Sequence, residues 1–281
     1  MANEKIFVSL PTPSIMGIKT IEHRNNGDII ETRTGHFTHK YVDCFYVVVE
    51  DELAKRVIES VACDCGHLPM KFIFSGAWGN QAACLFGFLL YAEKIKGSNI
   101  PPFSIIAIDD GDISIKSKEK RIDGLLKGNF IGAELKNLRD NLSNLLLSFN
   151  LEYLDENIKK GIPEYNHKKW FEEITKEMII KVDQPSNHYE YGQLESCLEI
   201  IEFSKGIELE DYHNYYEELS KCSPRNTIHT FHDVKYFVLN SIKKYNPIKW
   251  EQYTGHIKKA LVDLDAKNRE NFIASNVYLE R

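Results

Sequence analysis

The region between residues 43 and 112 alternates two kinds of segment, and this alternation constrains the fold more than any other feature. The segments 43–50 (DCFYVVVE), 70–76 (MKFIFSG) and 103–109 (FSIIAID) are short, apolar and rich in β-branched and aromatic residues, as strands buried on both faces are. Between them, residues 52–62 and 80–96 carry apolar side chains at helical spacing. This order predicts right-handed crossovers and three parallel strands in one sheet.

The regions on either side of this core differ in character. Residues 1–40 form an N-terminal extension, in which 17–34 alternate apolar and polar residues around Asn26-Gly27 and predict a β-hairpin. The α/β core is assigned to 41–115. Residues 116–190 form a helical insertion that begins with a lysine-rich, glycine-punctuated connector (115–129, IKSKEKRIDGLLKGN).

The second half of the chain is predicted to be mainly helical. Helices are expected at 131–160 and 166–182, and further helices extend to the end of the last region, 191–281. Within that region, 196–206 (SCLEIIEFSKG) is a candidate strand that returns to the sheet, with a helix as the alternative. The predicted fold class is therefore α/β: a parallel sheet flanked by helices, with an additional mainly helical region.

The composition is that of a globular cytoplasmic protein. Of 281 residues, 43% are hydrophobic and 27% charged, and the formal net charge is −6. The N-terminus lacks the pattern of a signal peptide, and no stretch approaches the roughly 18 apolar residues of a membrane span. We therefore expect a cytoplasmic location, reduced thiols and no contact with a membrane. The net charge neither favours nor excludes nucleic acid, because a few basic residues around one cleft suffice.

Acidic residues directly follow two of the predicted strands. Glu50 ends the first strand, and Asp110 and Asp112 follow the third as a D-x-D pair, with Asp109 beside them. Ligands of open parallel sheets bind at the carboxyl ends of strands, so these acids should share one edge. Carboxylates crowded together need a cation, and oxygen ligands favour Mg²⁺ or Mn²⁺. The alternative is that each acid caps a helix or begins a turn.

A second metal-binding hypothesis is weaker. Cys63, Cys65 and His67 would suit zinc by residue type, but C-x-C is closer than usual zinc spacing and no second pair completes four ligands. The alternative is an ordinary loop with incidental thiols.

The glutamate after the first strand and the D-x-D after the third resemble the Toprim domain, which topoisomerases, primases and nucleases share. Within that group the sequence most resembles nucleases of the OLD (overcoming lysogenization defect) family. It is also similar to the stand-alone Toprim effectors of the PARIS anti-phage system, which work beside a separate ATPase. The resemblance covers residues 40–115 well and the helical remainder only loosely.

The resemblance implies roles for individual residues. Glu50 would be the acid–base glutamate and a metal ligand, and Asp110 and Asp112 would bind the metal, with Asp109 as a further candidate ligand. The family glutamate is usually followed by Gly and, four residues on, by an acid; here Asp51 and Ala54 stand there. Asp51 or Glu52 would then substitute.

A second metal or phosphate site is also implied. OLD-like nucleases add a later carboxylate and a lysine, for which Lys205, Glu208 and Glu210 are the candidates, with Lys205 as a catalytic residue. Lys116 is a further candidate for holding phosphate. The alternative for the three later residues is a solvated helix start.

These observations predict a Mg²⁺- or Mn²⁺-dependent nuclease of anti-phage type that cuts DNA or RNA, with tRNA among the candidate substrates. No G-x-x-x-x-G-K-[ST] occurs, so an ATPase that controls the nuclease would be a separate ABC- or AAA-type chain. Aromatic-rich C-terminal helices predict a homodimer or docking of that ATPase. One alternative is a non-hydrolytic Toprim-like or receiver-like module. Another is a nucleotide-sugar transferase, although the 109 residues before D-x-D are few for that class.

Overall fold

The computed structural model describes most of the chain from residue 45 onwards and two short segments before it. The described residues are 5–8, 18–22, 45–65, 68, 70–76, 80–94, 105–127, 130–152, 162–184, 188–222 and 234–279.

Four parallel strands form the central sheet. β3 (Phe45–Val49), β4 (Met70–Phe74) and β5 (Ile105–Asp109) lie where the sequence predicts strands, and all are parallel. The fourth strand, β6 (Leu146–Ser148), pairs with β5 and gives the order β4-β3-β5-β6. The sequence analysis placed residues 146–148 in the predicted helix 131–160, and that prediction was wrong. Three residues are too few for any periodicity to mark a strand.

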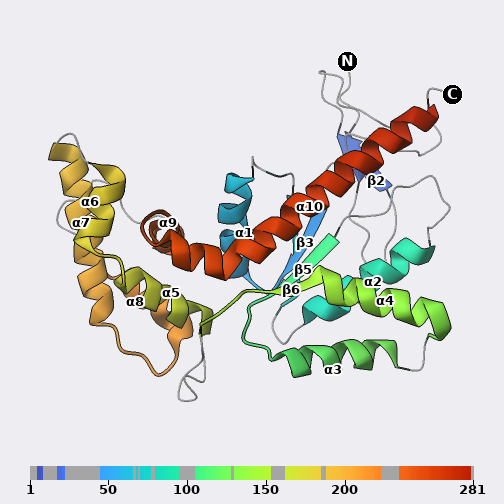
Figure 1. Cartoon of the computed structure of the whole chain (residues 1–281), viewed down its shortest axis with the longest axis horizontal. Helices are drawn as coiled ribbons and strands as arrows, with labels where there is room; N and C mark the ends of the chain where they lie inside the picture. The colour runs from blue at the N-terminus through green and yellow to red at the C-terminus, as the bar shows by residue number, and fades with distance from the viewer. Residues whose placement is uncertain are drawn as a thin grey trace.

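Helices cover both faces of the sheet (Figure 1). α1 (Glu52–Asp64) joins β3 to β4, and α2 (Asn80–Lys94) joins β4 to β5, close to the predicted bounds. The first connection leads away from β5 and the second leads back past β3. Because right-handed crossovers in opposite directions lie on opposite faces, α1 and α2 cover different sides of the sheet.

Side chains of the strands alternate between two cores. Val47 and Val49 of β3 pack on the α1 side, together with buried residues of the C-terminal helices. Tyr46 and Val48 pack on the α2 side. The α1 side is the larger core, and it includes the fully buried rings of Trp170, Tyr215 and Tyr253.

Two further helices join α2 on its side of the sheet. α3 (Ile115–Leu126) and α4 (Gly132–Leu145) bury Ile122, Leu126, Leu138 and Leu142 there. The sequence predicted a connector over 115–129, and the structure instead has a helix, capped by the Ser114 hydroxyl, which accepts from the Ser117 N–H at 3.2 Å. Only Ile122 and Leu126 of this helix are buried, so its apolar residues form a narrow stripe that gives a weak helical pattern in the sequence.

The remaining helices pack on the α1 side and form most of the second half of the chain (Figure 1). They are α5 (Ile162–Glu172), α6 (Lys176–Asp183), α7 (His188–Lys205), α8 (Tyr215–Leu219), α9 (Val234–Tyr245) and α10 (Pro247–Leu279), with a 3₁₀ turn at Tyr212–Asn214. In the part of the chain that the structure describes, no helix combines the length and apolar character needed to cross a membrane.

The candidate returning strand at 196–206 is a helix, as part of α7. Its buried positions are Ser196, Cys197, Ile200, Ile201 and Ser204, and this spacing of three and four residues defines one helical face. A short apolar run does not by itself distinguish strand from helix, and tertiary packing decides here. The strand that does return to the sheet is β6.

The N-terminal segments are partly described. β1 (Lys5–Val8) and β2 (Ile18–Glu22) pair antiparallel. The predicted hairpin at 17–34 begins in β2, but its Asn26-Gly27 turn and second strand lie outside the described residues.

A tight turn follows β5 and carries the D-x-D pair. Gly111, between the two aspartates, has φ of +93°, and a Cβ there would lie 2.3 Å from the Phe149 carbonyl oxygen. The Phe149 N–H in turn donates to the Asp109 carbonyl at 3.0 Å. The turn therefore fits against the chain leaving β6 only if residue 111 has no side chain.

We expect Gly111→Ala to lower the free energy of unfolding by about 3 kcal/mol, from left-handed backbone strain and the clash with Phe149. Gly124→Ala is the matched control, because no atom lies within 4 Å of its Cβ position inside α3. That control should gain about 0.5–1 kcal/mol. Urea denaturation measures both, and equal stability of Gly111→Ala and wild type would contradict the packing of this turn.

Candidate functional site

The carboxyl ends of β3 and β5 mark the point where the chain reverses direction across the sheet. β3 leads to β4 on one side, and the chain then returns to β5 on the other. Such a switch point leaves a crevice beyond the strand ends, where open α/β sheets bind ligands. Val48 is level with Ala107 in the register, so two residues further on Glu50 is level with Asp109. The strand ends that carry Glu50 and Asp109 therefore lie side by side, and Asp110 and Asp112 follow in the turn after β5.

Glu50 is half-buried directly after β3. Its Oε2 accepts a hydrogen bond of 2.9 Å from Nε2 of Gln81, at the start of α2. Burial raises the pKa of Glu50 above its ordinary value, the Gln81 hydrogen bond lowers it, and repulsion from Asp112 and Asp51 raises it further. The side chain is thus held in place and shifted toward the protonated form, which suits a proton-transfer role.

Asp109 lies on the α2 side of the sheet, where basic residues accompany it. It is buried in β5, and burial raises its pKa to about 6, while Lys118 and Arg121 of α3 lower it. The Lys118 ammonium also donates to the Ser148 hydroxyl at 3.3 Å and to the Leu146 carbonyl, which fixes it beside β6. Burial lowers the pKa of Lys118, and Asp109 opposes that shift.

Asp110 lies on the α1 side, where its neighbours are acidic. Burial raises its pKa to about 9, with repulsion from Asp51, Glu50, Asp112 and Glu164 adding to the shift. The largest causes of this shift are burial and four acids. These surroundings favour the neutral form of Asp110.

Two residues from the helical half close over this acidic side. Glu164 of α5 is buried, and burial raises its pKa. Tyr253 of α10 is also buried, and burial followed by Asp110, Glu164 and Asp51 raises the pKa of its phenol well above the ordinary value. The Asn150 N–H donates to the Tyr253 carbonyl at 3.3 Å, and the Phe149 ring stacks on Tyr253 at 4.9 Å. These contacts fix α10 against the chain leaving β6.

Asp51 and Glu52 begin α1, and they differ in their surroundings. The Asp51 carboxylate caps the helix by accepting from the Ala54 N–H at 2.9 Å, and its charge reaches Glu50 and Asp110. Glu52 is exposed and pairs instead with Lys55 at 2.9 Å and Arg56 at 3.3 Å along the helix. Asp51 and Glu52 were the two candidates to replace the acid that the family has at the position of Ala54. Asp51 lies near Glu50 and Asp110, whereas Glu52 pairs with basic residues of α1.

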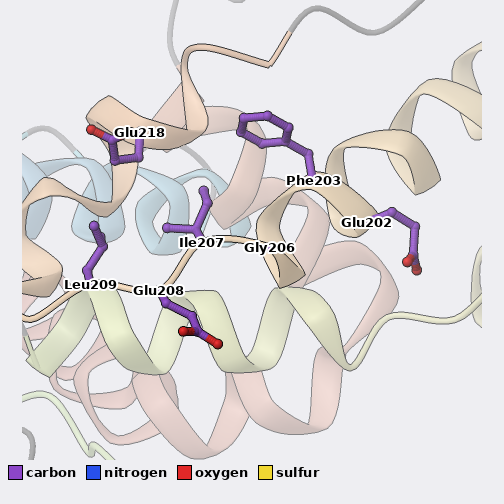
Figure 2. A pocket seen from close by; sticks show the side chains of 7 residues that line it. All are labelled: Glu202, Phe203, Gly206, Ile207, Glu208, Leu209 and Glu218. Carbon is purple, nitrogen blue, oxygen red and sulfur yellow. The ribbon is translucent and has the colours of Figure 1, made fainter.

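The later candidates do not join this cluster. Lys205 ends α7, which lies well away from β3 and β5 in Figure 1, and it pairs with Glu202 at 2.5 Å. Glu208 lines a shallow surface hollow of about 420 Å³ together with Phe203, Ile207 and Leu209 (Figure 2). Glu210 is exposed in the same loop, and Lys116 is exposed in the first turn of α3. The zinc candidates Cys63 and Cys65 are free thiols, and His67 lies outside the described residues.

A hard divalent cation fits the donors of this site. Glu50, Asp110 and Asp112 offer only oxygen, which Mg²⁺ and Mn²⁺ prefer, and burial followed by repulsion from neighbouring acids raises the pKa of Asp110. Among the described residues, however, no three His, Cys, Asp or Glu side chains are close enough together to hold a metal as they stand. Side-chain rotation would have to draw the carboxylates onto one point.

The sequence prediction did not include several residues of this site, namely Gln81, Lys118, Arg121, Glu164 and Tyr253. Arg121 lay in a segment interpreted as a connector, and Glu164 is separated from the core by a long stretch of chain. Gln81 follows the second strand, but a neutral amide gives no charge signal. The helical spacing of Lys118, Arg121 and Ile122 was the one available clue, because it places basic residues at the edge of a buried stripe.

No protein-family model matches the chain, and no curated protein matches its sequence. Among solved structures, the C-terminal region of the OLD protein of Xanthomonas campestris pv. campestris is similar over 79% of this chain and 94% of its own. The identity is 12% and the TM-score 0.32. That protein bears the family name that the motifs resemble, but so low a TM-score carries no argument.

We expect the metal-free protein to lose stability as pH rises from about 4 to about 9. Unfolded Asp110 ionises near 3.8, whereas the folded carboxyl keeps its proton to about pH 9. The folded state then holds one more proton, and stability falls by about 1.4 kcal/mol per pH unit. Asp110→Asn, which is neutral throughout, should flatten this decline and be more stable than wild type at pH 8.

Chemical denaturation in EDTA between pH 5 and 8 measures the effect. Asp140→Asn, an exposed aspartate of α4, is the control and should keep the wild-type slope. A wild-type slope in Asp110→Asn would show that Asp110 is ionised in the folded protein.

Proposed function

We propose that this protein is a metal-dependent nuclease of the Toprim type, with Glu50, Asp110 and Asp112 as its central residues. The observation that carries the proposal is the position of these acids at the switch point between β3 and β5, with Asp110 surrounded by acids. Structural acids are normally paired with a base or exposed to water. Asp110 is half-buried, and an acid whose main charged neighbours are also acids is the arrangement expected where a bound cation is part of the working site.

The residues would divide the work of phosphodiester cleavage among them. Asp110 and Asp112, with Glu50, would hold Mg²⁺ or Mn²⁺, which supplies charge neutralisation at the phosphate and lowers the pKa of bound water. Glu50 would take up or deliver a proton, because its pKa is raised and Gln81 holds its carboxylate. Asp109 would remain beside Lys118 and Arg121 on the other face, as a structural partner more than a ligand.

Arg121 is the better candidate for holding the substrate phosphate. It is half-buried on α3, and its charge lowers the pKa of both Glu50 and Asp109. A guanidinium presents a fork of donors that matches a phosphate group. Lys205, by comparison, is engaged with Glu202 on its own helix.

The biological setting of the proposal comes from the sequence resemblance. It comprises anti-phage defence in the cytoplasm, a DNA or RNA substrate (tRNA included), control by a separate ABC- or AAA-type ATPase, and a homodimer. The homodimer and the docking of the ATPase were expected from the aromatic C-terminal helices. Tyr215, Tyr216 and Trp250 of these helices are buried in the core, so the structure gives these two expectations less support than the sequence did. Tyr236 of α9 stays exposed.

A second candidate function is a non-hydrolytic Toprim-like or receiver-like module that acts through protein contacts. One observation favours it: the described acids are not drawn together into a ready coordination sphere. Failure to cleave any nucleic acid with the ATPase present would make this the preferred function.

We expect Glu50→Gln to fold normally and to lose cleavage by on the order of 10²-fold or more, because an amide cannot move the proton. The assay incubates purified protein, with and without a co-encoded ATPase, against plasmid DNA and total tRNA in Mg²⁺, Mn²⁺ or EDTA. Cleavage that persists in EDTA, or in Glu50→Gln at the wild-type rate, would falsify the mechanism. Glu59→Gln, an exposed-face substitution on α1, should cleave like wild type.

Arg121→Ala should weaken substrate binding more than Lys205→Ala does. If Arg121 holds a phosphate, its loss should raise KM and reduce the salt dependence of binding, because one fewer counter-ion is released. Lys205→Ala should leave both unchanged. Cleavage kinetics between 50 and 200 mM salt give the comparison, and the reverse ranking would restore Lys205 as the phosphate ligand.

A further inference from the structure

The side chain of Gln81 is the most closely confined polar group beside the proposed site. It belongs to the first turn of α2 and is 0% exposed. Its Nε2 donates to Glu50 Oε2 at 2.9 Å, across the gap between α2 and the end of β3. The contact joins residues far apart in the chain, so it depends on the docking of α2 on the sheet.

The other end of this amide has no hydrogen-bond partner among the residues that the structure describes. Oε1 of Gln81 is buried, and within the described part of the chain it accepts no hydrogen bond. Buried acceptors are nearly always satisfied, because an unpaired one loses its hydration without return. A side chain of the same length without polar atoms would fill this space with no unpaired acceptor, so packing alone does not account for a glutamine.

The geometry points to Gln81 as a positioning residue that holds the Glu50 carboxylate in the orientation needed for proton transfer during cleavage. This inference rests on the proposed function and adds a residue to it. The amide N–H fixes one carboxylate oxygen of Glu50, Oε2, and makes no bond to the other, Oε1. An amide can do this without adding charge to a site that already holds several carboxylates.

If Gln81 positions Glu50, one substitution should affect stability and activity differently. Gln81→Met keeps the length and volume of the side chain but removes both the donor and the unpaired acceptor. If the Gln81 amide served only stability, through its hydrogen bond to Glu50, this change would lower the unfolding midpoint, and activity would fall in proportion. A positioning residue would leave the unfolding midpoint equal to or above that of wild type while cleavage falls.

The experiment compares Gln81→Met with wild type in urea denaturation and in cleavage kinetics with Mn²⁺. We expect kcat to fall on the order of 10-fold, as for residues that orient a catalytic group, with KM within about twofold. Ser60→Ala is the matched control: it also removes a buried oxygen that lacks a partner among the described residues, but on α1 away from the strand ends. Its cleavage should equal that of wild type.

A direct measurement of the contact does not depend on activity. In ¹⁵N-labelled protein, the side-chain amide signals of Gln81 are identified by their loss in Gln81→Met. They should shift in Glu50→Ala and exchange with water more slowly than those of exposed glutamines. Unshifted signals in Glu50→Ala would overturn the contact itself.

The outcomes separate this inference from the proposed function. Gln81→Met that cleaves like wild type, or that loses stability and activity together, overturns the positioning role while the nuclease proposal stands on Glu50→Gln. Wild-type protein that cleaves no nucleic acid overturns both, and the amide signals then show whether the Gln81–Glu50 contact exists without that role.

Discussion

At the ends of β3 and β5 the fold places carboxylates close together and partly out of water. Both conditions disfavour their ionised forms, which water would otherwise stabilise. Desolvation is the largest cause of the raised pKa of Glu50, Asp109 and Asp110 alike, and mutual repulsion adds to it. The surrounding residues can be understood as the means by which the fold holds this arrangement. Gln81 donates a hydrogen bond to Glu50, and Lys118 and Arg121 of α3 lie near Asp109. Asp51 accepts a hydrogen bond from the first turn of α1 and remains near Glu50 and Asp110.

Strand alternation gives the two faces of this edge different electrostatic characters. Consecutive residues of a strand point to opposite faces, so Asp109 and Asp110 cannot share surroundings even though they are neighbours in sequence. Asp109 faces α3, where Lys118 and Arg121 lie, and Asp110 faces α5 and α10, which contribute Glu164 and Tyr253. The charged surroundings therefore favour a cation on the Asp110 side and an anion on the Arg121 side. The pKa of Glu50 is shifted by charges of both kinds, upward by Asp112 and downward by Arg121.

The sequence was informative where periodicity is long or strong. Three strands, their parallel direction and α1 and α2 followed from apolar runs between turn residues. The location of Glu50, Asp110 and Asp112 at the ends of β3 and β5 also followed, whereas their role in a site stays a prediction. What escaped prediction depends on tertiary contacts. β6 is three residues long, α7 contains an apolar run that suits strand or helix equally, and α3 hides its helical stripe among lysines. Gln81, Arg121 and Glu164 reach the site only because their helices dock against the sheet, which no local pattern encodes.

Tyr253 belongs to the last helix of the described chain, yet it forms a wall beside acids that come from the first half. During synthesis on the ribosome, β3, α1, β4, α2 and β5 emerge long before α10 does. The acidic edge therefore exists as an open, hydrated strand end for much of translation, and it is enclosed only when Tyr253 and Glu164 pack over Asp110. A nascent chain with exposed, hydrated carboxylates has neither the raised pKa nor the fixed geometry of the finished site. Assembly from distant parts of the chain would thus delay the formation of this enclosed site until α5 and α10 have been synthesised and have packed against the sheet.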